Sequence, residues 1–139
     1  MKKEKDKFGN FVHEQRKKEE ELLNICQDIM KNSRNELAVS MHFLYGALSA
    51  LKVVPSGGTG NMGTDGKLLY VNPQWLINQF MEYKVPINRM YLHELFHCLF
   101  CHLWYRKERD IPIWDLAADI TVEHVLDELY EKAVYIRPC

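Results

Sequence analysis

The stretch Met90-Tyr91-Leu92-His93-Glu94-Leu95-Phe96-His97 decides the fold, because it contains the pattern His-Glu-x-x-His. On an α-helix, residues four positions apart lie about 40° apart around the axis and one turn apart along it. The imidazoles of His93 and His97 can then both reach one tetrahedral zinc ion, while Glu94 stands beside them to transfer a proton. The pattern therefore predicts a metal-binding helix of the kind found in metallopeptidases.

The apolar residues of this helix place the two histidines at the edge of a buried face. With about 100° per residue, several large apolar side chains fall in one sector beside His93. They are Leu92, Phe96, Leu99 and Leu103. The alternative for this pair is that one or both histidines are hydrogen-bonded core residues.

A zinc site of this type needs a third protein ligand. Asp119 is the candidate, because a helical projection of residues 112–126 places it on the same side as the apolar residues that follow it. A carboxylate in an apolar stripe is costly unless a cation meets it. Glu123 is the reserve candidate and Asp115 the third. The alternatives for Asp119 are an ion pair with an arginine or a hydrogen bond to a ligating imidazole.

His102 lies close to the motif, but a continuous helix would place it about 180° from His93. We expect no helix break between Cys98 and Cys101. Position 100 is not a glycine and position 103 is not a histidine, which excludes the metzincin spacing. Cys98-x-x-Cys101-His102 also matches covalent haem attachment, a pattern of exported proteins. A second Cys-x-x-Cys, needed for a four-thiolate zinc site, is absent, so we interpret these cysteines as ordinary thiols.

The sequence outside the motif predicts an α+β fold that is mostly helical, with a small two- or three-stranded sheet. Alternating charges over residues 1–20 predict a flexible, solvated lead-in, and residues 21–139 are expected to form the domain. Apolar spacing then predicts two helices, the second starting with a capping box at Ser33 and ending near Leu51.

Two short strands are predicted after these helices, over residues 52–54 and 68–71. The glycine-rich segment between them lacks the Lys-Ser/Thr ending of a phosphate-binding loop and leads into a strand, so we interpret it as a connection. Pro73 suits the first turn of a further helix. We expect residues 68–71 to form an edge strand along which an extended peptide pairs.

Length and composition indicate one ordinary globular domain. The chain has 139 residues, of which 47% are hydrophobic and 27% charged. A net charge of −1 provides no overall field that would attract nucleic acid or an acidic membrane. The sequence contains neither a secretory signal nor an apolar run of about 18 residues. The four cysteines are therefore expected to be reduced thiols in a cytoplasmic protein.

Taken together, these motifs resemble the putative metallopeptidase domain that lies N-terminal to von Willebrand A-like domains in bacterial proteins. The resemblance covers roughly residues 25–130 and implies a zincin-like fold with the His-Glu-x-x-His helix at its active site. It rests on these residues: Thr64-Asp65-Gly66, Leu69-Tyr70, His93-Glu94-Leu95-Phe96-His97, His102, Arg106, Arg109 and Trp114-Asp115-Leu116-Ala117-Ala118-Asp119.

The resemblance also bears on the third ligand and on the length of the protein. Asp119 matches the family's aspartate, whereas the family usually has asparagine where this chain has Asp115 and Glu123. The von Willebrand A-like portion does not follow here. We therefore expect the chain to be truncated before a C-terminal domain.

Three functions remain open from these residues. In the first, the domain is a zinc peptidase that hydrolyses peptide or protein substrates, with Glu94 as general base. Its Zn²⁺ ligands are His93, His97 and Asp119. In the second, the domain is a metal-binding adaptor that cleaves nothing and acts with a von Willebrand A-like domain and an AAA+ ATPase. In the third, no metal binds and Asp119 is hydrogen-bonded to an imidazole. Candidates for the oxyanion stabiliser are Tyr91, Tyr105 and His124.

Overall fold

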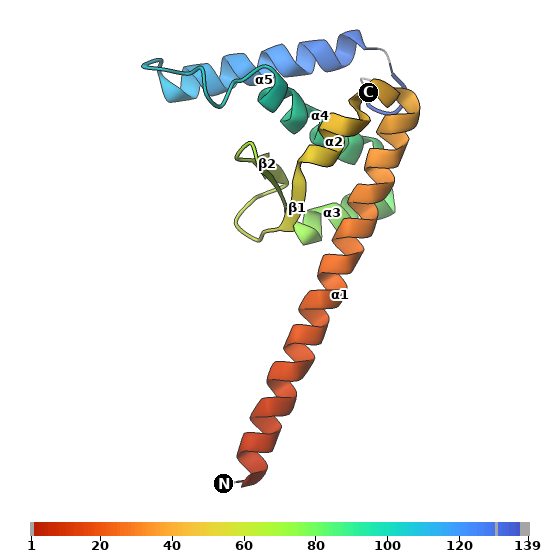
Figure 1. The fold of residues 1–139 in the computed structure, drawn as a ribbon, viewed down its shortest axis with the longest axis vertical. Coiled ribbons are helices and arrows are strands. Elements are labelled where there is room, and N and C mark those ends of the chain that lie inside the picture. Colours follow the sequence, from red (N-terminus) through yellow and green to blue (C-terminus); the bar gives the residue numbers. More distant parts are fainter. Residues whose placement is uncertain (1, 130, 137–139) are drawn as a thin grey trace.

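The computed structural model describes residues 2–129 and 131–136. The order of elements is α1 (Lys2–Ser40), a short 3-10 helix η1 (His42–Leu44), α2 (Tyr45–Ala50), β1 (Lys52–Pro55), β2 (Met62–Thr64), β3 (Leu68–Val71), α3 (Pro73–Glu82), α4 (Val85–Leu99) and α5 (Ile111–Glu128) (Figure 1). The predicted α+β class, mostly helical with a small sheet, is confirmed.

The sheet has three strands in the order β1-β3-β2, with β1 parallel and β2 antiparallel to β3. Both predicted strands are present, and the helix expected at Pro73 begins there, capped by the Asn72 side chain, which accepts a hydrogen bond from the Trp75 amide. The prediction that residues 68–71 form an edge strand is wrong. β2, a three-residue strand inside the glycine-rich segment, pairs with the side of β3 that was expected to be free.

Helix α1 is continuous, so the predicted helix start at Ser33 is wrong. Ser33 is buried in mid-helix, and its hydroxyl donates to Oδ1 of Asn88 on α4 at 2.6 Å instead of capping a new helix. Residues 2–20 are helical and almost entirely exposed, where a frayed lead-in was expected. They project away from the rest of the protein (Figure 1). The domain division at residue 20 remains a prediction.

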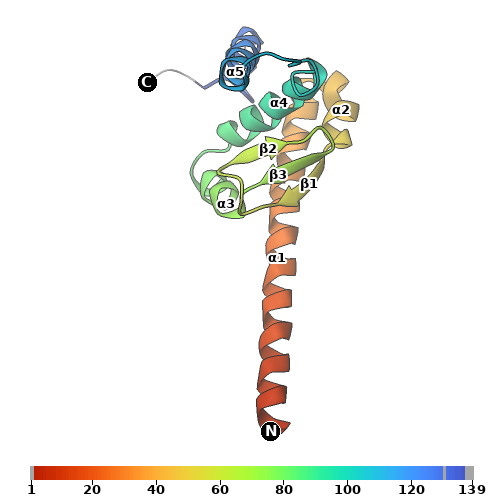
Figure 2. The same ribbon diagram turned by 90° about the vertical axis from the view of Figure 1, so that its left-hand side faces the viewer.

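The core lies between the C-terminal half of α1, the sheet and α4. The sheet lies beside this half of α1, with α3 and α4 close by (Figure 2). Leu92 and Phe96 of the predicted apolar stripe are buried, whereas Leu99 and Leu103 are about half exposed because the helix ends at Leu99. Within the described residues, no helix combines the length and hydropathy needed to cross a membrane.

Candidate metal centre

Two helices supply the ligands of the centre, and the sequence marks the start of each helix. α4 has Pro86 in its first turn, where the missing N–H costs nothing. α5 is capped by Asp110, whose carboxylate accepts a hydrogen bond from the amide of Ile113. α5 crosses over α4 (Figure 1), which brings the histidines of α4 and the aspartate of α5 together.

Three ligand atoms converge between these helices. Nε2 of His93 and Nε2 of His97 are 2.9 Å apart. Oδ1 of Asp119 lies 2.8 Å from the His97 nitrogen and 3.2 Å from the His93 nitrogen. A tetrahedral zinc site with bonds of about 2.0–2.1 Å sets its ligand atoms about 3.3 Å apart. The spacing is close to that of a metal-ligand set, slightly contracted.

The chemistry of these atoms fits a cation. The Glu123 carboxylate, 2.7 Å from Nδ1 of His93, only accepts hydrogen bonds, so Nδ1 carries the hydrogen. Nε2 of the neutral His93 ring then presents a lone pair, as does the Asp119 oxygen beside it. If Nε2 of His97 carries a hydrogen, it can donate a hydrogen bond to Nε2 of His93 or to Oδ1 of Asp119, but not fully to both. A metal ion would satisfy all three lone pairs together.

Glu123 is placed as a support for His93 and not beside the three ligand atoms. Its carboxylate also accepts hydrogen bonds from the guanidinium of Arg89, a buried residue one turn before His93 on α4. Arg89 in turn donates to Asp127 at 2.8 Å. A carboxylate behind a ligating histidine fixes its tautomer and orientation. Arg89 was missed in the sequence, although a charged residue at helical spacing before both histidines was the available signal.

The expectation of no helix break between Cys98 and Cys101 is wrong, although His102 does not join the three ligand atoms. Helix α4 ends at Leu99, and Cys101 adopts a left-handed conformation with φ +59°. The amides of Cys101 and His102 donate to the carbonyls of Cys98 and His97, which is a Schellman motif. The chain therefore turns back, and Nδ1 of His102 lies 3.0 Å from Nδ1 of His97.

The loop that carries His102 is held at two points. The indole of Trp114, in the first turn of α5, donates to the His102 carbonyl at 2.8 Å. Trp104 packs against Gly66, where an added Cβ would meet the indole ring at 2.6 Å. Gly66 has φ +95°, so both its conformation and the close approach require glycine. These contacts hold the loop against α5 on one side and against the turn between β2 and β3 on the other.

Glu94 lies beside the histidines and is largely buried. Burial raises the pKa of its carboxyl from 4.5 to about 7, with an opposing effect of His93 and a reinforcing effect of Asp119. A general base is most effective when its pKa lies near the working pH. The position of Glu94 thus suits proton transfer at neutral pH.

Burial also favours the neutral form of two imidazoles. It lowers the pKa of His97, an effect that His93 reinforces and Asp119 opposes. Burial lowers the pKa of His102 as well, again against Asp119. Neutral imidazole is the form that binds a metal.

The remaining predicted residues lie elsewhere. Asp115 is exposed and does not belong to the group of three ligand atoms. Tyr91 is wrong as an oxyanion stabiliser, because it is buried on the opposite side of α4 and its hydroxyl donates to the carbonyl of Leu48 at 2.6 Å. Tyr105 and His124 are exposed. Among the described cysteines, Cys26, Cys98 and Cys101 are free thiols, and Cys139 lies outside the described residues.

Two histidines from one helix and a carboxylate from a second helix define a protein with a candidate centre for one metal ion, a type of centre on which hydrolytic enzymes are built. Residues 27–133 match the family described as a putative metallopeptidase domain, and the chain belongs to that family.

The comparison with individual proteins adds one relative. Over 110 residues, the chain is 26% identical to an uncharacterized protein of Thermotoga maritima, a match that covers 74% of this chain and 27% of the relative. The chain thus corresponds to little more than a quarter of that relative's length. No solved structure matches the chain.

Proposed function

We propose that this domain is a zinc-dependent peptidase in which His93, His97 and Asp119 hold the ion. The observation that carries the proposal is the convergence of three lone-pair atoms, 2.8 to 3.2 Å apart, beside the largely buried Glu94. Membership of the metallopeptidase family supports the same reaction class. A purely structural cluster would have no use for a buried carboxylate that touches none of these atoms.

Glu94 is the proposed general base. When bound, zinc would supply the positive charge that lowers the pKa of a water molecule towards about 7. Glu94 accepts a proton from the attacking water and later gives it to the leaving amine. Glu123 and Arg89 keep the His93 ring in the tautomer that presents Nε2 to the centre.

The structure suggests β2 as the strand that guides a peptide substrate. Around α4, Glu94 lies between the histidines and Cys98, whose thiol is 3.9 Å from the Thr64 hydroxyl of β2. Within the described part of the chain, β2 pairs only with β3 and so leaves one edge open. An extended peptide added along this edge would pass on the Glu94 side of the centre.

The substitution Glu94→Gln tests this function. It removes the base while keeping the size of the side chain, so zinc content should stay near one ion per chain and peptide hydrolysis should fall by at least about 100-fold. Hydrolysis is followed by mass spectrometry on a broad peptide library, with and without chelator. Glu82→Gln, at the exposed end of α3, is the matched control. Undiminished hydrolysis in the Glu94 variant would remove Glu94 as the base.

One observation favours the adaptor function as a second candidate. Ile113, Leu116 and Ile120 lie on one face of α5 and are each more than 60% exposed. A von Willebrand A-like domain or an AAA+ ATPase would cover such a face. Under this function Glu94→Gln would leave binding of the partner intact, and no library peptide would be cleaved. A cytoplasmic location remains a prediction from the sequence in either case.

A further inference from the structure

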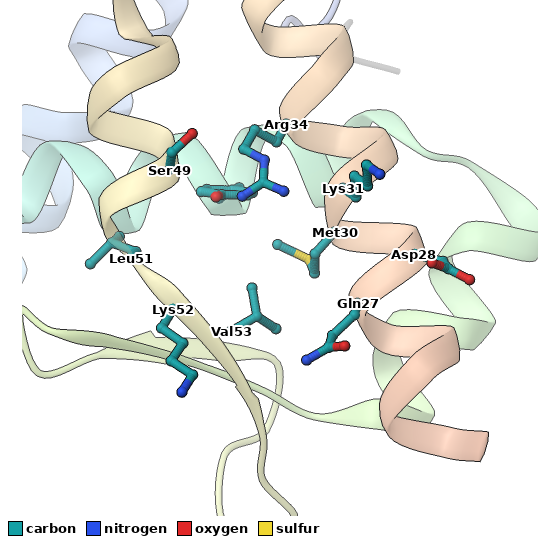
Figure 3. A pocket seen from close by; sticks show the side chains of 10 residues that line it. Gln27, Asp28, Met30, Lys31, Arg34, Ser49, Leu51, Lys52 and Val53 are labelled. Atoms are coloured by element: carbon teal, nitrogen blue, oxygen red, sulfur yellow. The ribbon is translucent and has the colours of Figure 1, made fainter. Parts of the chain in front are cut away.

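A cavity of about 410 Å³ lies between α1, the end of α2 and β1 (Figure 3). Tyr91 of α4 lines it, about 160° around that helix from His93, so the cavity opens on the side of α4 that faces away from the metal centre. We propose that this cavity binds a small organic anion whose carboxylate or phosphate group contacts Arg34 and whose apolar part lies against the apolar residues of the lining.

The cavity walls carry an excess of positive charge. Lys31 and Arg34 come from α1 and Lys52 from β1, against a single carboxylate, Asp28. Asp28 lies on the far side of α1, and the end of the Lys52 side chain also points outward, so Arg34 is the cation that reaches into the cavity (Figure 3). In the part of the chain that the structure describes, none of the three cationic side chains forms a hydrogen bond or an ion pair. In a chain with a net charge of −1, this is a local field that favours an anion.

Arg34 is the residue most specific for the anion. Its guanidinium reaches from α1 towards the end of α2, where Ser49 lies (Figure 3), and the residue is half-buried. It lies close enough to Tyr91 for its charge to oppose the rise in the Tyr91 pKa that burial causes. A guanidinium presents a planar fork of N–H donors that matches a carboxylate or a phosphate. A bound anion would supply the acceptors that the protein does not provide.

The cavity lining is mixed. The polar Gln27 and Ser49 line it together with three apolar residues that are at least 95% buried, Met30, Leu51 and Tyr91. The Tyr91 hydroxyl already donates a hydrogen bond to the Leu48 carbonyl, so an apolar ligand would not leave it without a partner. The volume lies in the range of pockets that enclose small molecules, about 300–1,000 Å³. An anionic group attached to a ring-sized apolar body therefore fits this cavity better than a bare inorganic ion.

Isothermal titration calorimetry of the full chain tests the proposal with phenyl phosphate, benzoate and neutral benzamide. We expect at least one of the anions to bind with one site per chain, and benzamide to bind about tenfold more weakly than that anion or not at all. Tighter binding of phenyl phosphate would identify a phosphate-bearing ligand, and tighter binding of benzoate a carboxylate-bearing one. Equal binding of all three compounds, or binding of none, would overturn the proposal.

Two variants assign the binding to this cavity, because anions also coordinate metal ions. Arg34→Gln should weaken anion binding about tenfold or more, whereas Arg16→Gln, which removes the same charge from the projecting part of α1, should leave it unchanged. Lys52→Gln alters an exposed residue of β1 and is not expected to affect folding. It therefore tests whether the anion binds in this cavity if Arg34→Gln does not fold. We expect it to weaken binding about threefold. Unchanged binding in the folded variants would place the anion elsewhere.

Discussion

Helix α4 presents two chemically different faces to the rest of the protein. Towards α5 it carries Arg89, His93 and His97, whose side chains meet carboxylates of that helix. On the opposite side, Tyr91 and Leu95 are buried against apolar neighbours. Hydrogen bonds also join this side to other helices: Tyr91 donates to the Leu48 carbonyl of α2, and the buried Asn88 accepts from Ser33 of α1. The first face depends on particular partners at particular distances, whereas the second depends mainly on the packing of apolar side chains. We therefore expect substitutions on the first face to change metal binding and those on the second to change stability alone.

Asp119→Ala should produce the largest effect. It removes one of three ligands, so zinc affinity should fall by at least about 100-fold. Elemental mass spectrometry of untagged protein measures the metal content. Asp115→Ala, one turn earlier on α5 and exposed, is the control and should keep its zinc. Full occupancy in the Asp119 variant would move the third ligand to Glu123 or Asp115.

The same experiment separates the metal centre from a metal-free cluster. The hydrogen-bond distances between Asp119 and the two imidazoles are what the metal-free alternative requires as well. If no zinc is found after zinc is supplied, and chelator leaves the melting temperature unchanged, the histidines are structural. With a bound ion, chelator should lower the melting temperature, because binding to the folded state alone stabilises it.

Glu123→Gln should have the next largest effect. The amide can still accept from Nδ1 of His93, but the negative charge behind the ring and opposite Arg89 is lost. Zinc affinity should fall about 10- to 100-fold, as measured by competition with a chelator of known affinity. Asp127→Asn is the matched control, because Asp127 contacts Arg89 without touching His93. An equal loss in both variants would show that Arg89, and not the carboxylate at His93, governs the centre.

The contrast between the two faces also explains what the sequence could predict. The spacing of His93 and His97 is local, and an apolar period is local, so the metal helix and the buried face were predictable. The roles of Glu123 and Arg89 depend on how α5 packs on α4, because these residues are 34 positions apart. The sequence therefore indicates Glu123 only as a possible metal ligand, and it indicates no role for Arg89.

The sheet shows the same limit. Residues 52–54 and 68–71 contain β-forming side chains, and the sequence predicts both as strands. β2 contains only Met62, Gly63 and Thr64, and it is a strand because β3 pairs with it. A three-residue segment next to several glycines carries no periodic signal of its own. The position of the open edge, and hence of the proposed substrate strand, was therefore not available from the sequence.

Tyr91→Phe tests the apolar face. The substitution leaves the buried Leu48 carbonyl without its donor, so the free energy of unfolding should fall by about 1–2 kcal/mol. Zinc affinity should not change. Tyr70→Phe removes a hydroxyl that donates to Asp65 at the surface, and it should cost much less in a denaturant titration. Loss of zinc in the Tyr91 variant would mean that the two faces are coupled through α4.

Cys101→Gly should have the smallest effect, and it asks whether Cys101 contributes a thiol or only a backbone conformation. Cys101 is a non-glycine residue with φ +59° at the end of α4, so no glycine in the sequence marks the helix break that brings His102 against His97. Glycine adopts this conformation without the Cβ penalty, so the free energy of unfolding should rise by about 0.5–1 kcal/mol. Lys107→Gly, at φ +55° in the same loop, is the matched control and should give a similar gain in a denaturant titration. Zinc affinity should be the same in both variants, because within the described residues the Cys101 thiol donates to the Leu99 carbonyl and not to a ligand atom. A drop in zinc affinity in the Cys101 variant alone would assign the thiol to the polar face of α4.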